Sequence, residues 1–426
     1  MLQIARERVS PKRRIWNRVR VQLGGGVLVA AVLPMVGLSM LLDESPSITL
    51  IQQTSIGILF AITLGYYFLK NIAIFPGMRV NYYIVPSFLV SYGIVLACFF
   101  FLRLEYSGSA FLSSFGLCLT WFYLVYMLAQ RQLDVRIGIV PFGEVAALQE
   151  VSGIHWDWLS EPVLNGPYDA LVADLRADIP DIWETFIAES AIRGVAVFHV
   201  KQLRESITGR VEIEHLSENS FGSLVPFMAY LKIKRLADFL LAAAAGAVLL
   251  PFLLLIGLLV RLDSPGPALF RQERMGYRGR TFHVAKFRTM GHASDQTDLD
   301  RDGAMTKDDD PRVTKLGRFL RRTRIDELPQ ILNILKGEMS WIGPRPEAVV
   351  LSRWYEGELP FYRYRHIVPP GITGWAQVNQ GHVSDLDQVN HKLHYDFYYI
   401  TNFSPWLDIL ILIRTAHTVL TGFGSR

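Results

Sequence analysis

The sequence predicts a membrane protein of mixed class: four transmembrane helices, a small Rossmann-like α/β domain, and an α-rich domain with a re-entrant helix and interfacial amphipathic helices. Of the 426 residues, 50% are hydrophobic and only 19% are charged, which is more apolar than a water-soluble chain of this length. The apolar residues gather in runs long enough to cross a bilayer. Alternating strand and helix patterns separate the first four runs from a more polar C-terminal half.

Charge and cysteine content narrow the function classes. The formal net charge is +4, a mild basic excess that suits anionic lipid headgroups and phosphates. This excess is too small to indicate nucleic acid, and we expect no nucleic-acid partner. The two cysteines, Cys98 and Cys118, both lie inside apolar runs, so we expect neither a disulfide framework nor a zinc site.

The N-terminal part is predicted to be a basic cytoplasmic segment, 1–21, followed by a transmembrane domain, 22–130. Its apolar runs lie near 22–42, 48–69, 82–102 and 110–129. They are apolar on every face, which argues against a water-soluble helical bundle. Basic residues cluster in the loop between the second and third runs (Lys70, Arg79) and after the fourth (Arg131, Arg136), so both ends of the bundle should face the cytoplasm.

The segment 135–220 is predicted to form a small α/β domain with a parallel sheet. DVRIGIVPFGE reads as a strand and turn, DALVADL (169–175) as a second strand, PDIWETFIAESAIRG as a helix and VAVFHV as a third strand. VPFGE has one glycine where a dinucleotide-binding loop needs three, so nucleotide binding is not indicated. We expect a packing or regulatory module.

A third part, 232–426, begins with a long apolar helix whose core is 239–260. Lys234 and Arg235 precede this core and Arg261 follows it, so both ends favour the cytoplasmic side. Pro251 lies at its middle, where proline removes a helix hydrogen bond. We therefore predict a re-entrant helix over 235–260 in preference to a straight span. The segment 404–422 carries Asp408 and Arg414 and is predicted to lie in the membrane interface as an amphipathic helix.

The candidate site centres on RRTRIDELPQILN (321–333), where Asp326 and Glu327 are adjacent. The nearby arginines are Arg318, Arg321, Arg322, Arg324 and, in WIGPRPE, Arg345. Guanidinium groups bind phosphate, while one carboxylate can hold Mg²⁺ and another can attack phosphorus. The alternative is an acidic pair at a helix N-terminus beside solvated arginines. This stretch alone leaves both interpretations open.

Three longer motifs together resemble the bacterial sugar transferase family. They are FRQERMGYRGRTFHVAKFRTM (270–290), DELPQILNILKGEMSWIGPRPE (326–347) and PGITGWAQVN (370–379). The family comprises polyprenyl-phosphate phosphoglycosyl transferases built on a re-entrant membrane helix. The resemblance runs from about Lys232 to the C-terminus, and the preceding domains resemble those of long-form members.

The resemblance implies an undecaprenyl-phosphate sugar phosphotransferase, with 232–426 as its catalytic domain. It would transfer a hexose-1-phosphate from a UDP-sugar to undecaprenyl phosphate and release UMP, initiating exopolysaccharide, capsule or O-antigen synthesis. Asp326 would be the nucleophile that forms a covalent aspartyl-phosphosugar, and Glu327 would be a ligand of Mg²⁺. A homodimer in the bacterial inner membrane, with its catalytic domain on the cytoplasmic face, is expected.

Further positions carry family roles by resemblance. Phosphate-binding candidates are Arg321, Arg345, Lys286 and Arg288, and the residues of the re-entrant helix are Lys234, Arg235, Asp238 and Pro251. The sequence departs from many relatives at Pro369, where they carry a basic residue before PGITGW. The missing contact is either absent or supplied by Arg365 or His366.

Some alternatives stay open at this point. The chain could be a non-catalytic membrane scaffold or sensor in polysaccharide assembly, or the acceptor could attack directly with Asp326 as base or metal ligand. The sugar is not specified. The histidines show no metal-ligand spacing. Tyr395, Tyr398 and Tyr399 are interpreted as an interfacial aromatic belt.

Overall fold

The fold is taken from a computed structural model of the chain. It describes residues 16, 18–41, 47–72, 81–130, 136–148, 155–166, 168–211, 213, 228–291, 312–380 and 385–421. Most of the predicted basic N-terminus, together with Arg79 and Arg131, lies outside the described residues. The chain divides into two compact units, Met1–Gly209 and Arg210–Arg426, and each is described by itself.

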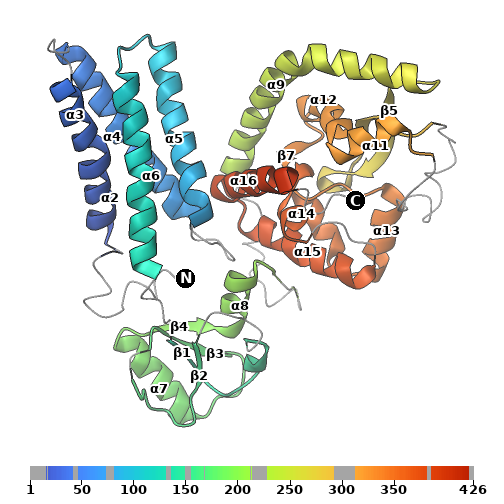
Figure 1. Cartoon of the computed structure of the whole chain (residues 1–426). Coiled ribbons are helices and arrows are strands. Elements are labelled where there is room, and N and C mark those ends of the chain that lie inside the picture. The colour runs from blue at the N-terminus through green and yellow to red at the C-terminus, as the bar shows by residue number, and fades with distance from the viewer. Residues whose placement is uncertain are drawn as a thin grey trace. The chain divides into compact units, whose positions relative to one another are not determined.

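Helices occupy the four apolar runs of the first unit (Figure 1). They are α2 (Val19–Val27), continued by the π-helix η1 (Leu28–Val32) and α3 (Leu33–Leu41), then α4 (Ile48–Ile72), α5 (Asn81–Phe101) and α6 (Gly108–Gln130). Glycines allow close packing of α4 on α5, because a Cβ on Gly65 would lie 2.4 Å from the Phe88 ring. Within the described residues, five helices are long and apolar enough to cross a membrane: these four segments and α9 (Met228–Asp263).

The first unit also contains the predicted parallel sheet, which has the strand order β2-β1-β3-β4. Its strands are β1 (Arg136–Ile139), β2 (His155–Trp158), β3 (Ala170–Ala173) and β4 (Ala196–His199), with helices α7 (Asp181–Ile192) and α8 (Val200–Thr208) and the 3-10 turn η2 (Val145–Leu148). All three strand pairings are parallel, as predicted. The sequence patterns did not predict β2, whose residues HWDW are half-exposed.

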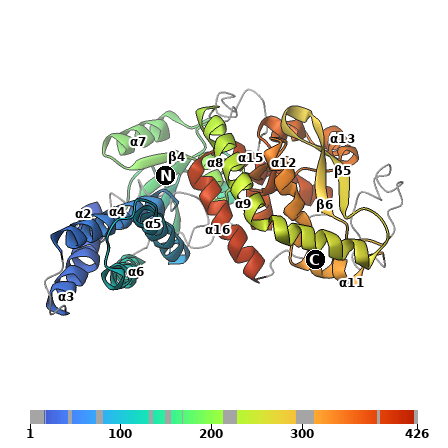
Figure 2. The same cartoon turned by 90° about the horizontal axis from the view of Figure 1, so that it is seen from above.

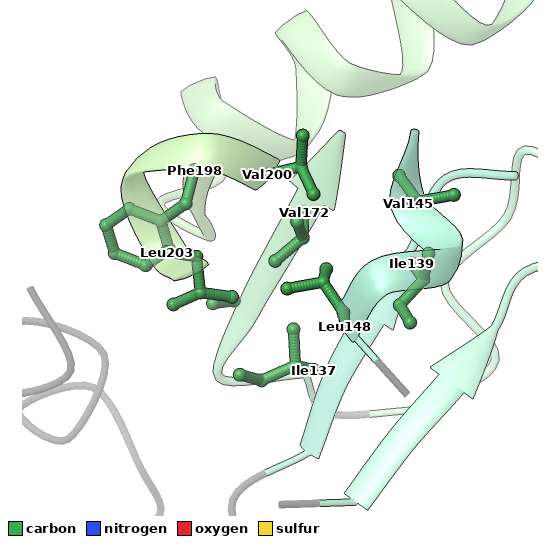
Figure 3. Packing of buried hydrophobic residues seen from close by; sticks show 9 residues of the cluster. Ile137, Ile139, Val145, Leu148, Val172, Phe198, Val200 and Leu203 are labelled. Atoms are coloured by element: carbon green, nitrogen blue, oxygen red, sulfur yellow. The ribbon is translucent and has the colours of Figure 1, made fainter. Parts of the chain in front are cut away.

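Alternation along the strands directs apolar side chains to both faces of this sheet. Ile137, Ile139 and Val172 pack on one face with Val200 and Leu203 of α8, as Figure 3 shows. Leu171 and Ala173 pack on the other face with Trp183 of α7. A parallel sheet covered on both faces by helices is the arrangement expected of βαβ units.

The second unit begins with α9 and continues through short elements around a β-hairpin. The hairpin strands are β5 (Leu269–Met275) and β6 (Thr281–Phe287), joined by the 3-10 turn η4 (Tyr277–Gly279). The rest comprises α11 (Lys315–Arg322), the 3-10 helix η5 (Ile325–Gln330), α12 (Ile331–Leu335), β7 (Ser340–Ile342), α13 (Val349–Glu358), the 3-10 helix η6 (Tyr362–Ile367), β8 (Gly371–Thr373), α14 (Trp375–Gln380), α15 (Leu386–Thr401) and α16 (Pro405–Thr421). The parallel pair β7–β8 leads into the arginine-bearing loop.

Helix α9 is strongly bent (Figures 1 and 2). Both of its arms pack on the same hairpin. Ala242 in the first arm packs with Phe282 and Val284 of β6. Val260 in the second arm packs with Phe287 of the same strand and with α11. Pro251 lies inside the helix, and proline is a common cause of sharp kinks. The bend therefore brings the two ends of this apolar helix back to one small domain.

Candidate functional site

The acid pair lies on η5, immediately after α11. The chain reverses at Arg324, which has a left-handed backbone (φ 59°), and η5 begins at the next residue. Asp326 and Glu327 are only 8% and 7% exposed. Burial of two adjacent carboxylates is costly unless each is compensated, so the pair is not a solvated turn.

Glu327 is enclosed by three cations from three segments. Its Oε1 lies 2.6 Å from an Nη atom of Arg345, 3.2 Å from Nζ of Lys286 and 3.8 Å from Arg324. Burial alone would raise the pKa of Glu327, but Arg345 and Lys286 outweigh it and hold that pKa well below its usual range. Glu327 is therefore an ionised carboxylate that organises the surrounding cations.

Asp326 has the opposite electrostatic situation. Burial raises the pKa of Asp326, the charge of Glu327 raises it further, and Lys286, Arg324 and Arg321 only partly oppose this. Among the described residues its Oδ1 has no hydrogen-bond partner. A buried, unbonded carboxylate oxygen needs an explanation, and an open position for a reacting atom or a metal ion provides one.

Arg321 approaches the pair from α11. Its Nε donates to Oγ1 of Thr289 at 2.9 Å, which fixes the guanidinium beside the hairpin. Gly317 allows α11 to come this close, because a Cβ there would lie 2.1 Å from the Thr289 carbonyl oxygen. Its positive charge lowers the pKa of Asp326, which places Arg321 within electrostatic reach of that carboxylate.

Lys286, the other predicted phosphate-binding lysine, is presented by β6. Burial lowers the pKa of Lys286, and its ion pair with Glu327 opposes that shift. The structure thus brings together five of the sequence-predicted site residues: Asp326, Glu327, Arg321, Arg345 and Lys286.

Arg288 does not lie with this group. Its guanidinium donates to the carbonyl oxygens of Val260, Ser264 and Pro265, at 3.3, 2.5 and 3.0 Å. Gly266 (φ 123°) makes room for it, since a Cβ there would lie 2.1 Å from Nη1. The side chain caps the C-terminal end of α9, where carbonyl groups lack helical partners. Its sequence position two residues after Lys286 did not reveal this role.

The predicted residues of the helix entry attach α9 to the rest of the unit. Lys234 pairs with Asp408 of α16 at 2.8 Å and lies 3.7 Å from Asp238. Asp238 accepts a 2.7 Å hydrogen bond from Ser340 of β7. Arg235 stacks over the Tyr277 ring, 5.0 Å from its centroid.

The basic contact that the sequence lacks at Pro369 was left as either absent or supplied by Arg365 or His366. The structure does not favour the second alternative, because both residues are buried and Arg365 is bound to Asp396. Burial, with the charge of Arg365, lowers the pKa of His366 to about 3, so its ring is neutral at pH 7. The prediction of an interfacial aromatic belt was wrong. The tyrosines of α15, Tyr395, Tyr398 and Tyr399, are at most 7% exposed and form part of the core.

Sequence reasoning also missed a set of buried charges behind Arg345. They are Arg274, Glu347, Arg365, Lys392 and Asp396. One signal was available: Asp396 stands in the aromatic run HYDFYYI, and a charge in a buried helix face requires a partner. The partner itself could not be read from the sequence.

The acid pair is suited to the kind of Mg²⁺ site that has few protein ligands. Among the described residues, no three His, Cys, Asp or Glu side chains form a metal site. Mg²⁺ is commonly held by one or two carboxylates together with substrate phosphates and water. The unbonded Oδ1 of Asp326 meets that requirement directly. Glu327 is ionised, but it would have to exchange a contact with Arg345 for one with the metal. The metal would then help to neutralise a bound diphosphate.

Comparisons with known proteins identify the family of the chain's relatives. A family model described as bacterial sugar transferase matches residues 229–422. The chain is 44% identical over 354 residues, 83% of each chain, to UDP-N-acetylgalactosamine-undecaprenyl-phosphate N-acetylgalactosaminephosphotransferase of Aeromonas hydrophila. This match is longer than the second unit, so the likeness extends into the first.

Shorter matches join the chain to proteins named UDP-glucose:undecaprenyl-phosphate glucose-1-phosphate transferase. The protein of Escherichia coli (strain K12) is 43% identical over 198 residues, 46% of this chain and 41% of that protein. The protein of Caulobacter vibrioides is 41% identical over 202 residues, 47% of this chain and 74% of that protein.

Proposed function

The chain belongs to the bacterial sugar transferase family, and from that premise we propose that it transfers a hexose-1-phosphate from a UDP-sugar to undecaprenyl phosphate and releases UMP. This step would initiate assembly of a polysaccharide repeat unit. The observation that carries the proposal is the buried acid pair, with one carboxylate bound by cations and the other left with an open oxygen. A purely structural pair would have both carboxylates satisfied.

The proposed chemistry is a double displacement at the β-phosphorus. A carboxylate oxygen of Asp326 attacks that phosphorus, and the bond to the oxygen bridging the two phosphates breaks. UMP leaves with the bridging oxygen and its electron pair, and the sugar phosphate stays on Asp326. A phosphate oxygen of undecaprenyl phosphate then attacks the same phosphorus and releases the carboxylate. One phosphoanhydride replaces another, so a covalent intermediate divides one nearly isoenergetic exchange into two steps.

The cations of the site have separate tasks in this scheme. Arg321, held by Thr289, is within electrostatic reach of Asp326 and is proposed to bind a phosphate of the donor. Lys286 and Arg345 are paired with Glu327, and their remaining N–H groups can donate to phosphate oxygens. Glu327, with Asp326, is the proposed ligand of Mg²⁺.

We propose UDP-N-acetylgalactosamine as the donor. The support is the Aeromonas hydrophila relative, which matches over 83% of both chains, whereas the Escherichia coli glucose transferase matches over less than half of each. The test is a panel of UDP-sugars offered to the full-length chain with undecaprenyl phosphate and Mg²⁺, with UMP release as the signal. We expect the highest kcat/KM with the N-acetylgalactosamine donor. UMP release from none of the donors would instead support the scaffold alternative.

We further propose that the chain lies in the inner membrane, with four spans in the first unit and the catalytic unit on the cytoplasmic face. By length and composition α9 could also cross the bilayer. A straight span, however, could not pack both of its arms on β6 as α9 does. The proposed path enters the membrane, bends at Pro251 and returns. The predicted homodimer stays a prediction.

Cysteine labelling is expected to place both ends of α9 on one side of the membrane. In a background with Cys98→Ala and Cys118→Ala, single cysteines are introduced as Ala229→Cys and Asp263→Cys and exposed to an impermeant maleimide. Both should react in inside-out vesicles and be protected in right-side-out vesicles. Glu105→Cys, in the loop between α5 and α6, is the control and should show the reverse. Labelling of Asp263→Cys together with Glu105→Cys would establish a spanning helix.

A further inference from the structure

The loop that carries Arg345 is held by three successive backbone carbonyls. It connects β7 to α13 and forms no regular structure of its own. The carbonyl oxygens of Arg345, Pro346 and Glu347 accept hydrogen bonds from Nη2 of Arg365 (2.9 Å), Nη1 of Arg274 (3.0 Å) and the backbone N–H of Met275 (2.9 Å). Two of the three donors are guanidinium groups, so side chains from distant segments determine the path of this loop.

The guanidinium of Arg365 is fully occupied by contacts within the protein. Its Nε donates to Oδ2 of Asp396 at 3.1 Å, its Nη2 lies 2.8 Å from the same oxygen, and its Nη1 donates to the Tyr362 hydroxyl at 2.7 Å. With the Arg345 carbonyl, these contacts engage all three nitrogens of the guanidinium. The side chain is 3% exposed, so it does not reach a substrate.

Asp396 fixes Arg365 from α15, a helix that does not contribute to the acid pair. Its side chain is 2% exposed, and a charge this deeply buried requires a partner. Two nitrogens of the planar guanidinium lie against the same Oδ2 of Asp396 while a third donates to Tyr362, and contacts on two edges of a planar group fix its orientation. A lysine could retain the charge but not that orientation.

A shift of the Arg345 backbone would move the guanidinium that binds Glu327 of the acid pair. The Arg345 side chain reaches Glu327 with its two terminal nitrogens, at 2.6 and 3.4 Å. Lys286 binds Oε1 of Glu327, the oxygen that also accepts the 2.6 Å hydrogen bond from Arg345. A displacement of Arg345 by about 1 Å would therefore disturb the whole cation cluster, and misplacement on that scale can cost about a hundredfold in rate.

We propose that Arg365, anchored by Asp396 and Tyr362, is a positioning residue that presents Arg345 to the reacting phosphates. The proposal rests on the sugar-phosphate transfer described above. It assigns to Arg365 an effect that acts only through Arg345, in contrast to a general contribution to folding.

A double-mutant cycle tests this assignment. Arg365→Lys is made in the wild-type chain and in an Arg345→Lys chain, and kcat/KM for the UDP-sugar is measured by UMP release in the same membrane preparation. In the wild-type background we expect a loss of at least about tenfold. In the Arg345→Lys background the two-nitrogen contact with Glu327 is already gone, so the further loss should be below about threefold.

Val389→Ala provides the matched control, since Val389 is a buried apolar residue of the same helix as Asp396. Its effect should be the same factor in both backgrounds. Tyr362→Phe removes a single hydrogen-bond acceptor from Arg365. If Arg365→Lys does not yield folded protein, Tyr362→Phe takes its place in the double-mutant cycle. Equal factors for the Arg365 or Tyr362 variant in both backgrounds would overturn the positioning role. A wild-type chain that releases no UMP would instead refute the proposed function.

Discussion

Asp326→Asn is expected to lower UMP release by at least about a thousandfold, as the loss of a catalytic nucleophile does. The amide has nearly the same shape as the carboxylate but no nucleophilic oxygen. The substitution should not unfold the protein. Because burial and the charge of Glu327 raise the pKa of Asp326, its ionised form is unfavourable in the folded state. The variant should be at least as stable as wild type at neutral pH, which thermal unfolding can verify.

Covalent labelling separates this loss from other causes. Wild-type protein incubated with UDP-sugar labelled in the β-phosphate, without acceptor, should retain the label on the chain after denaturation. The Asp326→Asn protein should retain none. If the variant turned over at the wild-type rate, the nucleophile would be misassigned. Loss of turnover in the variant, with no label on either protein, would favour direct attack by the acceptor.

The same carboxylate should produce an acid limb in the pH profile. Attack requires ionised Asp326, so kcat should fall as pH decreases through a pKa above the ordinary aspartate value of about 3.9. Arg321 is one of the charges that lower the pKa of Asp326. In an Arg321→Ala protein the residual activity should therefore decline at a higher pH than in wild type. An acid limb that did not move would mean that another group controls it.

Sequence patterns predicted the elements whose buried residues recur with regular spacing. The strand in DALVADL and the helix that starts at Asp181 follow from apolar residues with regular spacing, because each packs one or two faces on a single core. The edge strand β2 has two half-buried residues between two exposed ones, so its residues show no apolar run. The bend of α9 was predicted from Pro251 and the flanking charges, and it agrees with the packing of both arms on β6.

For the candidate site, the sequence identified residues by chemistry but not their partners. Asp326, Glu327 and Arg345 come from motifs, and the structure brings them together. Arg288 was predicted to bind phosphate and Arg365 was one possible source of the basic contact missing at Pro369, yet Arg288 caps α9 and Arg365 holds a loop carbonyl. Which carbonyl groups an arginine meets depends on contacts between segments far apart in the chain, and a single sequence does not contain that information.

Glu327→Gln is expected to cause the largest combined loss of stability and activity. The change removes the carboxylate that forms ion pairs with Arg345, Lys286 and Arg324. Loss of one partner of a buried ion pair costs about 3–5 kcal/mol, because the remaining charges stay desolvated. The partly exposed Arg324 adds little to this. UMP release should fall by at least about a hundredfold, since the two cations no longer have fixed positions.

The pH dependence of stability tests the cage that Arg345, Lys286 and Arg324 form around Glu327. Because the pKa of Glu327 is depressed in the folded state, its contribution is fully present above the ordinary glutamate pKa of about 4.3 and is lost only as pH falls below that value. The difference in free energy of unfolding between wild type and Glu327→Gln should therefore be constant from pH 8 to about pH 5 and shrink below it. A difference that already shrinks between pH 8 and pH 6 would contradict the assignment.

Glu356→Gln provides the matched control, because Glu356 lies in the same unit and its ion-pair partner within the described part of the chain is His366, at 3.7 Å. The low pKa of His366 leaves that ring neutral, so the control should change stability little. The two roles of Glu327, as the centre of the cage and as a proposed metal ligand, predict different effects of Glu327→Gln. Loss of the cage lowers stability in the absence of Mg²⁺, whereas loss of a ligand raises the Mg²⁺ concentration needed for half-maximal UMP release. A stability loss with an unchanged Mg²⁺ requirement would assign Glu327 to the cations alone and leave Asp326 as the carboxylate open to the metal.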